Sequence, residues 1–449
     1  MDEFYTWMNR HEQEFLQDLA TMIRIRSVSE SGSGLAPYGA ACQEALVTML
    51  QIAASYGFEV RDCDGHAGEI FYSKGCTGLD IGIWGHLDVV PEGEGWSYPP
   101  YELSREGDFL IGRGVQDNKG PLLAVLYAMR FLKEQKWQPN NGYRLIFGCD
   151  EERGMKDVAY FLAHRKAPDY SFVADCGFPV CRGEKGMLVL EIKKEVPAGK
   201  ISSLKSGLVI NSVPGTACAV LNLKDGSQKT VQAEGKAGHA AFPDGTVHAA
   251  GILCRKLSEA FVLQSEEKEW LHFLYRLCAD GFGTGFGIIC EDAESGKLTC
   301  NAGIIDWENG MCRVSLDIRY PVSVSAEKLL EQVKYMAARE GFQWEVKKLE
   351  KPFCVPEDHP FVQRLMRVYG REVGDGKRPY IMGGGTYAKK IPHAVGFGPG
   401  LPQHLEMIGF NGSRGSCHSA DEAQSFTNLK LAAKIYAGVL PELERRTKL

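Results

Sequence analysis

Residues 81–88 read IGIWGHLD, an apolar run that ends in a histidine and an aspartate. Two later runs have the same design, namely YRLIFGCDEE at 143–152 and SFVAD at 171–175. A strongly helical segment at 121–135, with proline in its first turn, separates the first two runs. Strands that alternate with helices predict an α/β domain with a mixed, mostly parallel sheet flanked by helices.

The polar side chains that follow these runs are expected to lie together. Ligands of open α/β sheets bind outside the carboxyl ends of the strands. The segments GRGVQDNKG at 112–120 and SCH at 416–418 add further candidates. Carboxylates that share one crevice repel each other, and divalent cations remove that repulsion. A set of two histidines and three acids suits zinc, manganese or cobalt, and five ligands suit two ions that share a bridging carboxylate.

The sequence pattern changes after about residue 186. Alternating apolar and polar residues there predict half-exposed antiparallel strands, with helical patterns between them. The strand patterns are 187–192, 217–223 and 311–318, and the helical patterns are 247–263 and 326–341. From residue 358 the chain returns to the character of its first part. We therefore expect a catalytic domain of residues 1–186 and 358–449, interrupted by an α+β lid domain of residues 187–357.

Several motifs in this order resemble the aminoacylase/glutamate-carboxypeptidase family of dinuclear, M20-like metallopeptidases. The motifs are HLDVVP at 86–91, GRG through DNKG at 112–120, and the acidic pair at 151–152. Trp96, the GGGTY run at 383–387 and the large insertion are most similar to the peptidase V-type dipeptidases of that family. The resemblance covers essentially the whole chain.

The resemblance implies a set of metal ligands. His86, Asp117 and Asp175 would bind one ion, and Glu152 and His418 would bind the other, with Asp117 bridging the two. Two divalent ions per chain are therefore expected, with zinc placed before manganese or cobalt.

Other roles follow from the same resemblance. Asp88 would hydrogen-bond the second ring nitrogen of His86, and Glu151 would be the general base. The peptide bond between Asp117 and Asn118 would be cis.

The inserted domain would supply substrate groups. His239 would stabilise the oxyanion, and Asn211 and Arg319 would grip the substrate. Glycine allows close approach of a substrate to backbone N–H groups. The candidate residues of this run are Gly384, Gly385 and Thr386.

The expected function is hydrolysis of dipeptides that carry a free N-terminus. One alternative is an N-acyl-amino-acid deacylase of the same family, which would use the same metals and base. A non-catalytic binding protein would lack a ligand or the base, and neither is missing. A cysteine-nucleophile amidase is disfavoured because Cys417 and His418 are neighbours whose side chains would diverge on a strand. Cys149, Cys176 and Cys417 lie beside proposed site residues in the sequence. This proximity alone suggests that one of the three thiols makes the activity sensitive to oxidation.

Composition sets further limits on the expected partners and location. The formal net charge is −6, which gives no electrostatic reason to expect nucleic acid or an anionic membrane surface as a partner. No apolar run is long enough to span a bilayer, and the acidic start MDEF lacks a signal-peptide core. The 14 cysteines show no CxxC pairs, which is typical of reduced cytoplasmic thiols. We expect a cytoplasmic enzyme, a small-molecule dipeptide as its substrate and, by resemblance, a monomer.

Overall fold

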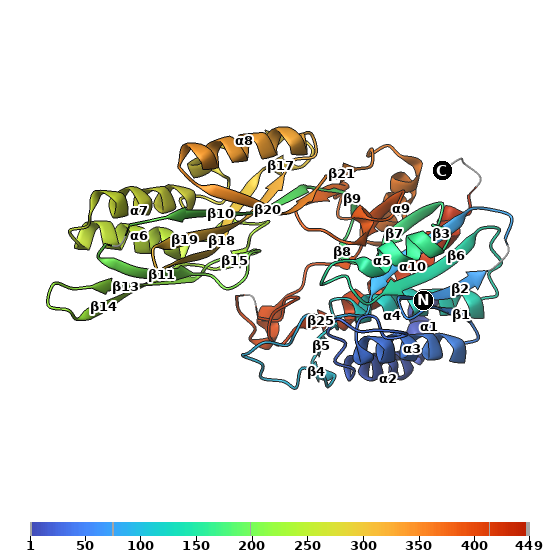
Figure 1. Cartoon of the computed structure of the whole chain (residues 1–449). Coiled ribbons are helices and arrows are strands. Elements are labelled where there is room, and N and C mark those ends of the chain that lie inside the picture. The colour runs from blue at the N-terminus through green and yellow to red at the C-terminus, as the bar shows by residue number, and fades with distance from the viewer. Residues whose placement is uncertain (1, 74–75, 198, 413, 446–449) are drawn as a thin grey trace. The chain divides into compact units, whose positions relative to one another are not determined.

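The computed structural model describes residues 2–73, 76–197, 199–412 and 414–445, and it divides into two units (Figure 1). The first unit comprises Met1–Gly183, Val355–Tyr380 and Gly385–Leu449, and the second comprises Glu184–Cys354 and Ile381–Gly384. Residues 381–384 were predicted to belong to the catalytic domain, whereas they lie in the second unit. Strands β21 (Phe353–Cys354) and β22 (Tyr380–Met382) lie where the chain passes between the units.

The first unit is built on a mixed sheet whose centre is parallel. Strand β3 pairs in parallel with β6 and β7, and β23 pairs in parallel with β7. Antiparallel pairing of β1 with β2, β2 with β6, and β9 with β23 extends it. This arrangement confirms the predicted α/β class. The strands, in their order across the sheet, are β1 (Glu59–Cys63), β2 (Ala67–Ser73), β6 (Gly142–Gly148), β3 (Asp80–His86), β7 (Tyr170–Val173), β23 (Ala394–Phe397), β9 (Val180–Glu184) and β21, and β22 also pairs with β9.

Helices pack against this sheet around one hydrophobic core. The apolar stripe between Phe4 and Met22 forms two helices, because the chain breaks at His11. The helix α3 ends before Gly57, whose φ of 75° is the left-handed conformation that favours glycine after a helix. The helices of this unit are α1 (Glu3–Arg10), α2 (Glu12–Ile23), α3 (Ala40–Ser55), α4 (Lys119–Glu134), α5 (Lys156–His164), α9 (Pro360–Glu372) and α10 (Phe426–Leu443).

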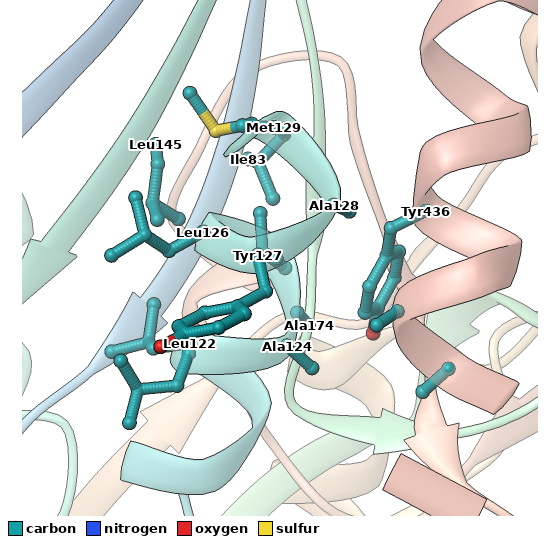
Figure 2. Packing of buried hydrophobic residues seen from close by; sticks show 14 of the residues in the cluster. Ile83, Leu122, Ala124, Leu126, Tyr127, Ala128, Met129, Leu145, Ala174 and Tyr436 are labelled. Carbon is teal, nitrogen blue, oxygen red and sulfur yellow. The ribbon is translucent and has the colours of Figure 1, made fainter. Parts of the chain in front are cut away.

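Helix α4 is the central helix of the unit and is buried on all sides over residues 119–132. Figure 2 shows its side chains among Ile83 of β3, Leu145 of β6 and Tyr436 of α10. An apolar residue is needed on every face because the sheet covers one side and α10 the other. The helix begins two residues earlier than predicted, so Pro121 still lies in its first turn.

Short strands connect distant segments of the first unit. Strand β25 (Ala423–Ser425) pairs with β5 (Phe109–Ile111), which pairs with β4 (Ser104–Glu106). Strand β8 (Cys176–Gly177) pairs with β24 (Pro399–Gly400), and η2 (Tyr387–Lys389) and η3 (Leu405–Ile408) are single turns of 3-10 helix. The β25–β5 pairing places the chain around residue 418 beside the loop that carries Asp117.

The second unit is an antiparallel seven-stranded sheet with helices over one face. Buried and half-buried residues alternate along β10, as the sequence pattern predicts for a sheet with one covered face. The strands in order are β14 (Gln228–Glu234), β13 (Thr216–Asn222), β11 (Ile201–Ser206), β18 (Thr299–Glu308), β19 (Met311–Tyr320), β10 (Gly186–Glu195) and β20 (Gln343–Glu350).

Helices α6 (Ala249–Ala260), α7 (Ser265–Leu277) and α8 (Ala326–Arg339) share one core with that sheet. The sequence analysis did not predict α7, although Gln264 and Glu267 form a capping box at its start. Smaller elements are η1 (Thr284–Phe286), the antiparallel pair of β12 (Ser212–Val213) with β15 (Gly238–His239), and the hairpin of β16 (Glu291–Asp292) with β17 (Gly296–Lys297). Within the described ranges, none of the helices has both the length and the apolarity required to cross a bilayer.

Candidate metal and catalytic site

The first unit brings the five expected ligands together at the carboxyl ends of its central strands. His86 is the last residue of β3, Glu152 follows β6, and Asp175 follows β7. Asp117 lies in the loop between β5 and α4, and His418 lies shortly before β25. Residues far apart in sequence thus meet at one edge of the sheet, as the strand-end rule predicts.

The Asp117 carboxylate lies between two imidazole rings. Its Oδ1 is 2.9 Å from His86 Nε2, and its Oδ2 is 3.1 Å from His418 Nε2. His86 Nε2 is also 3.6 Å from Asp175 Oδ2, and His418 Nε2 is 2.8 Å from Glu152 Oε1. One carboxylate therefore offers an oxygen to each of two neighbouring donor sets, which is the geometry of a bridging ligand.

Two triads could each hold a cation. In one, ligand atoms of His86, Asp117 and Glu152 lie within 4.8 Å of one another; in the other, those of His86, Glu151 and Asp175 do. Glu151, expected as the base and not as a ligand, therefore lies within 4.8 Å of the donor atoms of His86 and Asp175.

The electrostatics of the site fit bound cations. Burial, together with Asp175, raises the pKa of Glu151, and burial and the Asp117 charge raise the pKa of Glu152 to about 7. Burial lowers the pKa of His418, but hydrogen bonds to Asp117 and Glu152 outweigh it and raise that pKa to about 11. Without a cation, the site must hold extra protons to offset its carboxylates. Imidazole nitrogens and carboxylate oxygens are donors that suit zinc, manganese or cobalt.

Asp88 organises the strand ends around the donors. Its carboxylate accepts hydrogen bonds from the backbone N–H groups of Glu151 at 3.2 Å and Glu152 at 3.0 Å. His86 Nδ1 lies 2.9 Å from the Asp88 carbonyl oxygen and 3.3 Å from the Asp88 carboxylate. Either oxygen can accept a hydrogen bond from the Nδ1–H group of His86. This hydrogen bond directs Nε2 of His86 toward the donor cluster.

Glu422 was missed by the sequence analysis and fixes the Asp117 loop. Its buried carboxylate accepts hydrogen bonds from Arg113 and from the backbone N–H groups of Gly114, Gln116 and Asp117. Arg113 and Glu422 are both almost fully buried. No local pattern marks Glu422, because all of its partners lie more than 300 positions earlier in the chain.

Asn118, next to Asp117, connects the two sides of the site. Its side-chain amide donates to the Ala174 carbonyl oxygen at 2.7 Å and to Asp175 at 3.1 Å, and its oxygen accepts from the His86 backbone N–H at 3.2 Å. The Asp117–Asn118 peptide bond is cis, as the resemblance implied.

Asp157 is a second buried acid that the sequence did not reveal. It accepts hydrogen bonds from the backbone N–H groups of Cys149 and Asp150 and from the Tyr387 hydroxyl. These bonds fix the turn that leads into Glu151. Tyr387 belongs to the GGGTY run, and the Thr386 hydroxyl accepts a hydrogen bond from Ala388 N–H at the start of η2.

The second unit carries His239 and Asn211 side by side. Ser212 pairs with His239 across the β12–β15 ladder, and Ala240 N–H donates to the Asn211 carbonyl oxygen at 2.9 Å. The His239 Nδ1 accepts from Ala241 N–H at 3.1 Å. The neutral ring therefore carries its hydrogen on Nε2, which is the state needed to donate to an oxyanion.

Arg319 is buried and already paired within the second unit. Its Nε and Nη2 form a bidentate pair with Asp317, and its Nη1 donates to the Gly383 carbonyl oxygen at 3.1 Å. Gly384 lies in the same unit, whereas Gly385 and Thr386 lie in the first. The structure thus gives Arg319 a role in holding the glycine run, and its expected grip on the substrate stays a prediction.

All three thiols near the site are poorly suited to redox chemistry. The neighbouring Cys42 and burial raise the pKa of Cys149, and burial raises the pKa of Cys176 and of Cys417. The thiolate is the reactive form, so these side chains are expected to be slow to oxidise.

The comparisons with known proteins agree with this geometry. The model of peptidase family M20/M25/M40 matches residues 82–442. A Bacillus subtilis protein named "Putative dipeptidase YtjP" is 29% identical over 472 residues, covering 97% of this chain and 98% of the relative. A Staphylococcus haemolyticus protein named "Putative dipeptidase SH1171" is 30% identical over 427 residues, covering 87% of this chain and 90% of the relative.

A solved structure shows the same fold. The di-peptidase Dug1p from Saccharomyces cerevisiae superposes with a TM-score of 0.59 at 13% identity, and the alignment covers 98% of each chain. The match to the family model spans most of the sequence and includes every metal-ligand candidate. The chain therefore belongs to peptidase family M20/M25/M40 and is a hydrolase.

Proposed function

We propose that this protein is a metal-dependent dipeptidase that cleaves dipeptides with a free N-terminus. The observation that carries the proposal is the Asp117 carboxylate between His86 and His418, with Glu151 beside the same donor atoms. The relatives that match along most of the chain are named dipeptidases, which supports the substrate class.

The donor set would hold two divalent cations. His86, Asp117 and Asp175 would hold one, and Glu152, His418 and the second Asp117 oxygen would hold the other. Zinc is the ion we place first, with manganese and cobalt as alternatives. When bound, such cations supply Lewis acidity toward a peptide carbonyl and an attacking water.

Glu151 is the residue to which we assign proton transfer. It would accept a proton from the attacking water and deliver it to the leaving amine. The Glu151 carboxyl group would hold the proton between the two steps. His239 would donate from Nε2 to the oxyanion, and Asn211 and Arg319 would position the peptide.

The test compares matched substrates. Alanyl-alanine and its N-acetyl derivative are offered to chelator-stripped protein that is resupplied with zinc, manganese or cobalt in turn. Cleavage of the free dipeptide alone, restored by a metal, supports the dipeptidase. Preference for the acetylated compound moves the protein to the deacylases of the same family. No cleavage of either by protein that holds two ions per chain would contradict both enzyme proposals.

We also propose that the enzyme is a cytoplasmic monomer. Light scattering after size-exclusion chromatography should give a mass near 49.6 kDa, and a mass near twice that value would contradict the monomer.

A further inference from the structure

His418 is the least enclosed of the five expected metal ligands. Its side chain is 45% exposed, whereas the side chains of the other four are at most 18% exposed. Among the described residues, its ring contacts Glu152 and Asp117, in both cases through Nε2. His86, in contrast, is also held at Nδ1 by Asp88. Packing therefore does little to place His418, and its position depends on the backbone that carries it.

Residues 414–421, here called the His418 loop, contain two backbone conformations that side chains disfavour. His418 has a φ of 62° and Asp421 a φ of 55°, both in the left-handed region. Such conformations persist where surrounding contacts determine them, and they cluster at functional sites. One of these contacts closes the loop, because the Gly415 N–H donates to the Ala420 carbonyl oxygen at 3.0 Å.

Asp421 attaches this loop to a segment more than 300 positions earlier in the chain. It is fully buried, and its Oδ1 accepts hydrogen bonds from the backbone N–H groups of Ser97 at 2.8 Å and Tyr98 at 3.0 Å. Its Oδ2 accepts from Arg414 Nε at 2.7 Å, and Nη2 of the same guanidinium donates to the Ser97 hydroxyl at 2.7 Å. Charge-assisted hydrogen bonds are about twice as strong as neutral ones, so this carboxylate is a firm anchor.

The segment that receives Asp421 is itself fixed within the first unit. Tyr98 packs against the small apolar cluster of β5 and β25. Two positions further on, the Pro100 carbonyl oxygen accepts a hydrogen bond from the Arg113 N–H at 2.8 Å. Asp421 therefore attaches the His418 loop to a packed part of the first unit.

Asp421 and its neighbour Glu422 hold different ligand loops. Glu422 accepts hydrogen bonds from the loop of Asp117, which would bridge both ions. Asp421 holds the loop of His418, which would bind only one of them. A change at Asp421 should therefore affect one ion, whereas a change at Glu422 should affect both.

We propose that Asp421 is the positioning residue for His418. By holding the His418 loop against residues 97–98, it sets the affinity for the ion assigned to Glu152 and His418 and leaves the other ion unaffected. The inference rests on the metal centre of the proposed function and names a residue that controls one of its two ions.

The test measures metal binding by the full-length protein. Metal-free wild type and variants are titrated with zinc in competition with a fluorescent chelator, which gives two dissociation constants. Asp421→Gly keeps the left-handed backbone accessible but removes the carboxylate, so it should weaken one site about 10–100-fold and leave the other unchanged. Asp421→Asn keeps an acceptor for Ser97 and Tyr98 and should recover part of that affinity. Arg414→Met should cause an intermediate loss at the same site.

A double variant shows whether the effect passes through His418. His418→Ala should itself weaken the same site. Adding Asp421→Gly to His418→Ala should cause no further loss of metal affinity, because the side chain that Asp421 positions is already absent. A merely structural role would lower the affinity of this double variant further.

Asp64→Gly is the matched control. Asp64 is also a left-handed aspartate, with a φ of 58°, but its side-chain partners Tyr160 and Arg165 are not metal-ligand candidates. This variant should bind both ions as the wild type does.

Three results would overturn the inference. One is an equal weakening of both sites in Asp421→Gly, and another is wild-type affinity in both Asp421→Gly and Arg414→Met. The third is a further loss when Asp421→Gly is added to His418→Ala. If circular dichroism shows that Asp421→Gly does not fold, Asp421→Asn and Arg414→Met decide by the same criteria, alone and combined with His418→Ala.

The dipeptidase proposal fails separately. If the wild type binds two ions and cleaves no dipeptide, that proposal is contradicted, and the zinc titrations still decide the role of Asp421. If the wild type binds fewer than two ions, the proposed metal centre is wrong and the inference is overturned with it.

Discussion

At the metal centre, two adjacent glutamates are assigned different tasks. Glu151 should transfer protons and Glu152 should bind a cation, although both lie beside the same donors. We expect Glu151→Gln to lower kcat by about 10²–10⁴-fold, the usual contribution of a general base, with metal content retained. Glu152→Gln is the matched control and should lose one ion per chain. Plasma mass spectrometry of the dialysed proteins measures the metal, and loss of metal from Glu151→Gln would make Glu151 a ligand.

Asp157 makes stability depend on pH. Burial raises its pKa from 3.8 to about 7, so between these values the native state holds a proton that the unfolded chain has released. Its contribution is fully present below pH 3.8 and is lost as the pH rises through about 7. Between pH 4 and 8 the wild type should therefore lose up to about 4 kcal/mol of unfolding free energy relative to Asp157→Asn. Urea unfolding of both proteins measures this, and parallel pH profiles would contradict it.

At the scale of elements, the loop between β5 and α4 depends on one distant acceptor. Glu422→Ala would leave the Arg113 guanidinium and three backbone N–H groups without that carboxylate. We expect metal affinity to fall about 10–100-fold, as for other residues that orient metal ligands. Competition with a fluorescent chelator measures the affinity. Glu106→Ala, at an exposed position of β4, is the control, and equal affinities in the two variants would count against the anchoring role.

Helix α4 should be the element least tolerant of truncation. Leu126 is fully buried and packs in the core shown in Figure 2. Leu126→Ala should lower the unfolding free energy by about 2–5 kcal/mol, because the cavity it leaves adds to the lost burial. Chemical denaturation measures the change. A loss below 1 kcal/mol would mean that the helix repacks freely.

Some elements could be read from the sequence and others could not. The runs that became β3, β6 and β7 were recognisable because strands buried on both faces are continuously apolar. The break at His11 was missed because the apolar spacing continues across it. Glu422 and Asp157 were missed for another reason, since an acid that binds backbone N–H groups from distant segments carries no local signature. The family resemblance, and not periodicity, supplied the ligand roles.

On the scale of the whole molecule, each unit has its own core. Every core residue of the second unit lies between Leu188 and Phe342. We expect residues 184–354, produced as a separate chain, to fold and to unfold cooperatively. The buried Trp270 and Trp307 report the transition by fluorescence. A gradual change in urea, without a sigmoidal transition, would contradict independent folding, and the fragment should bind no metal because every candidate ligand lies outside it.

The positions of the metal ligands along the chain also determine the order in which the ribosome synthesises them. His86, Asp117, Glu152 and Asp175 leave the ribosome long before His418, which follows 418 − 175 = 243 residues later. At about 5–20 residues per second the delay is roughly 12–50 s. Glu422, which fixes the Asp117 loop, arrives only after His418. A nascent chain therefore carries four ligands, with the Asp117 loop still lacking Glu422, while the whole second unit is being translated, and correct loading with metal must wait until translation has passed Glu422.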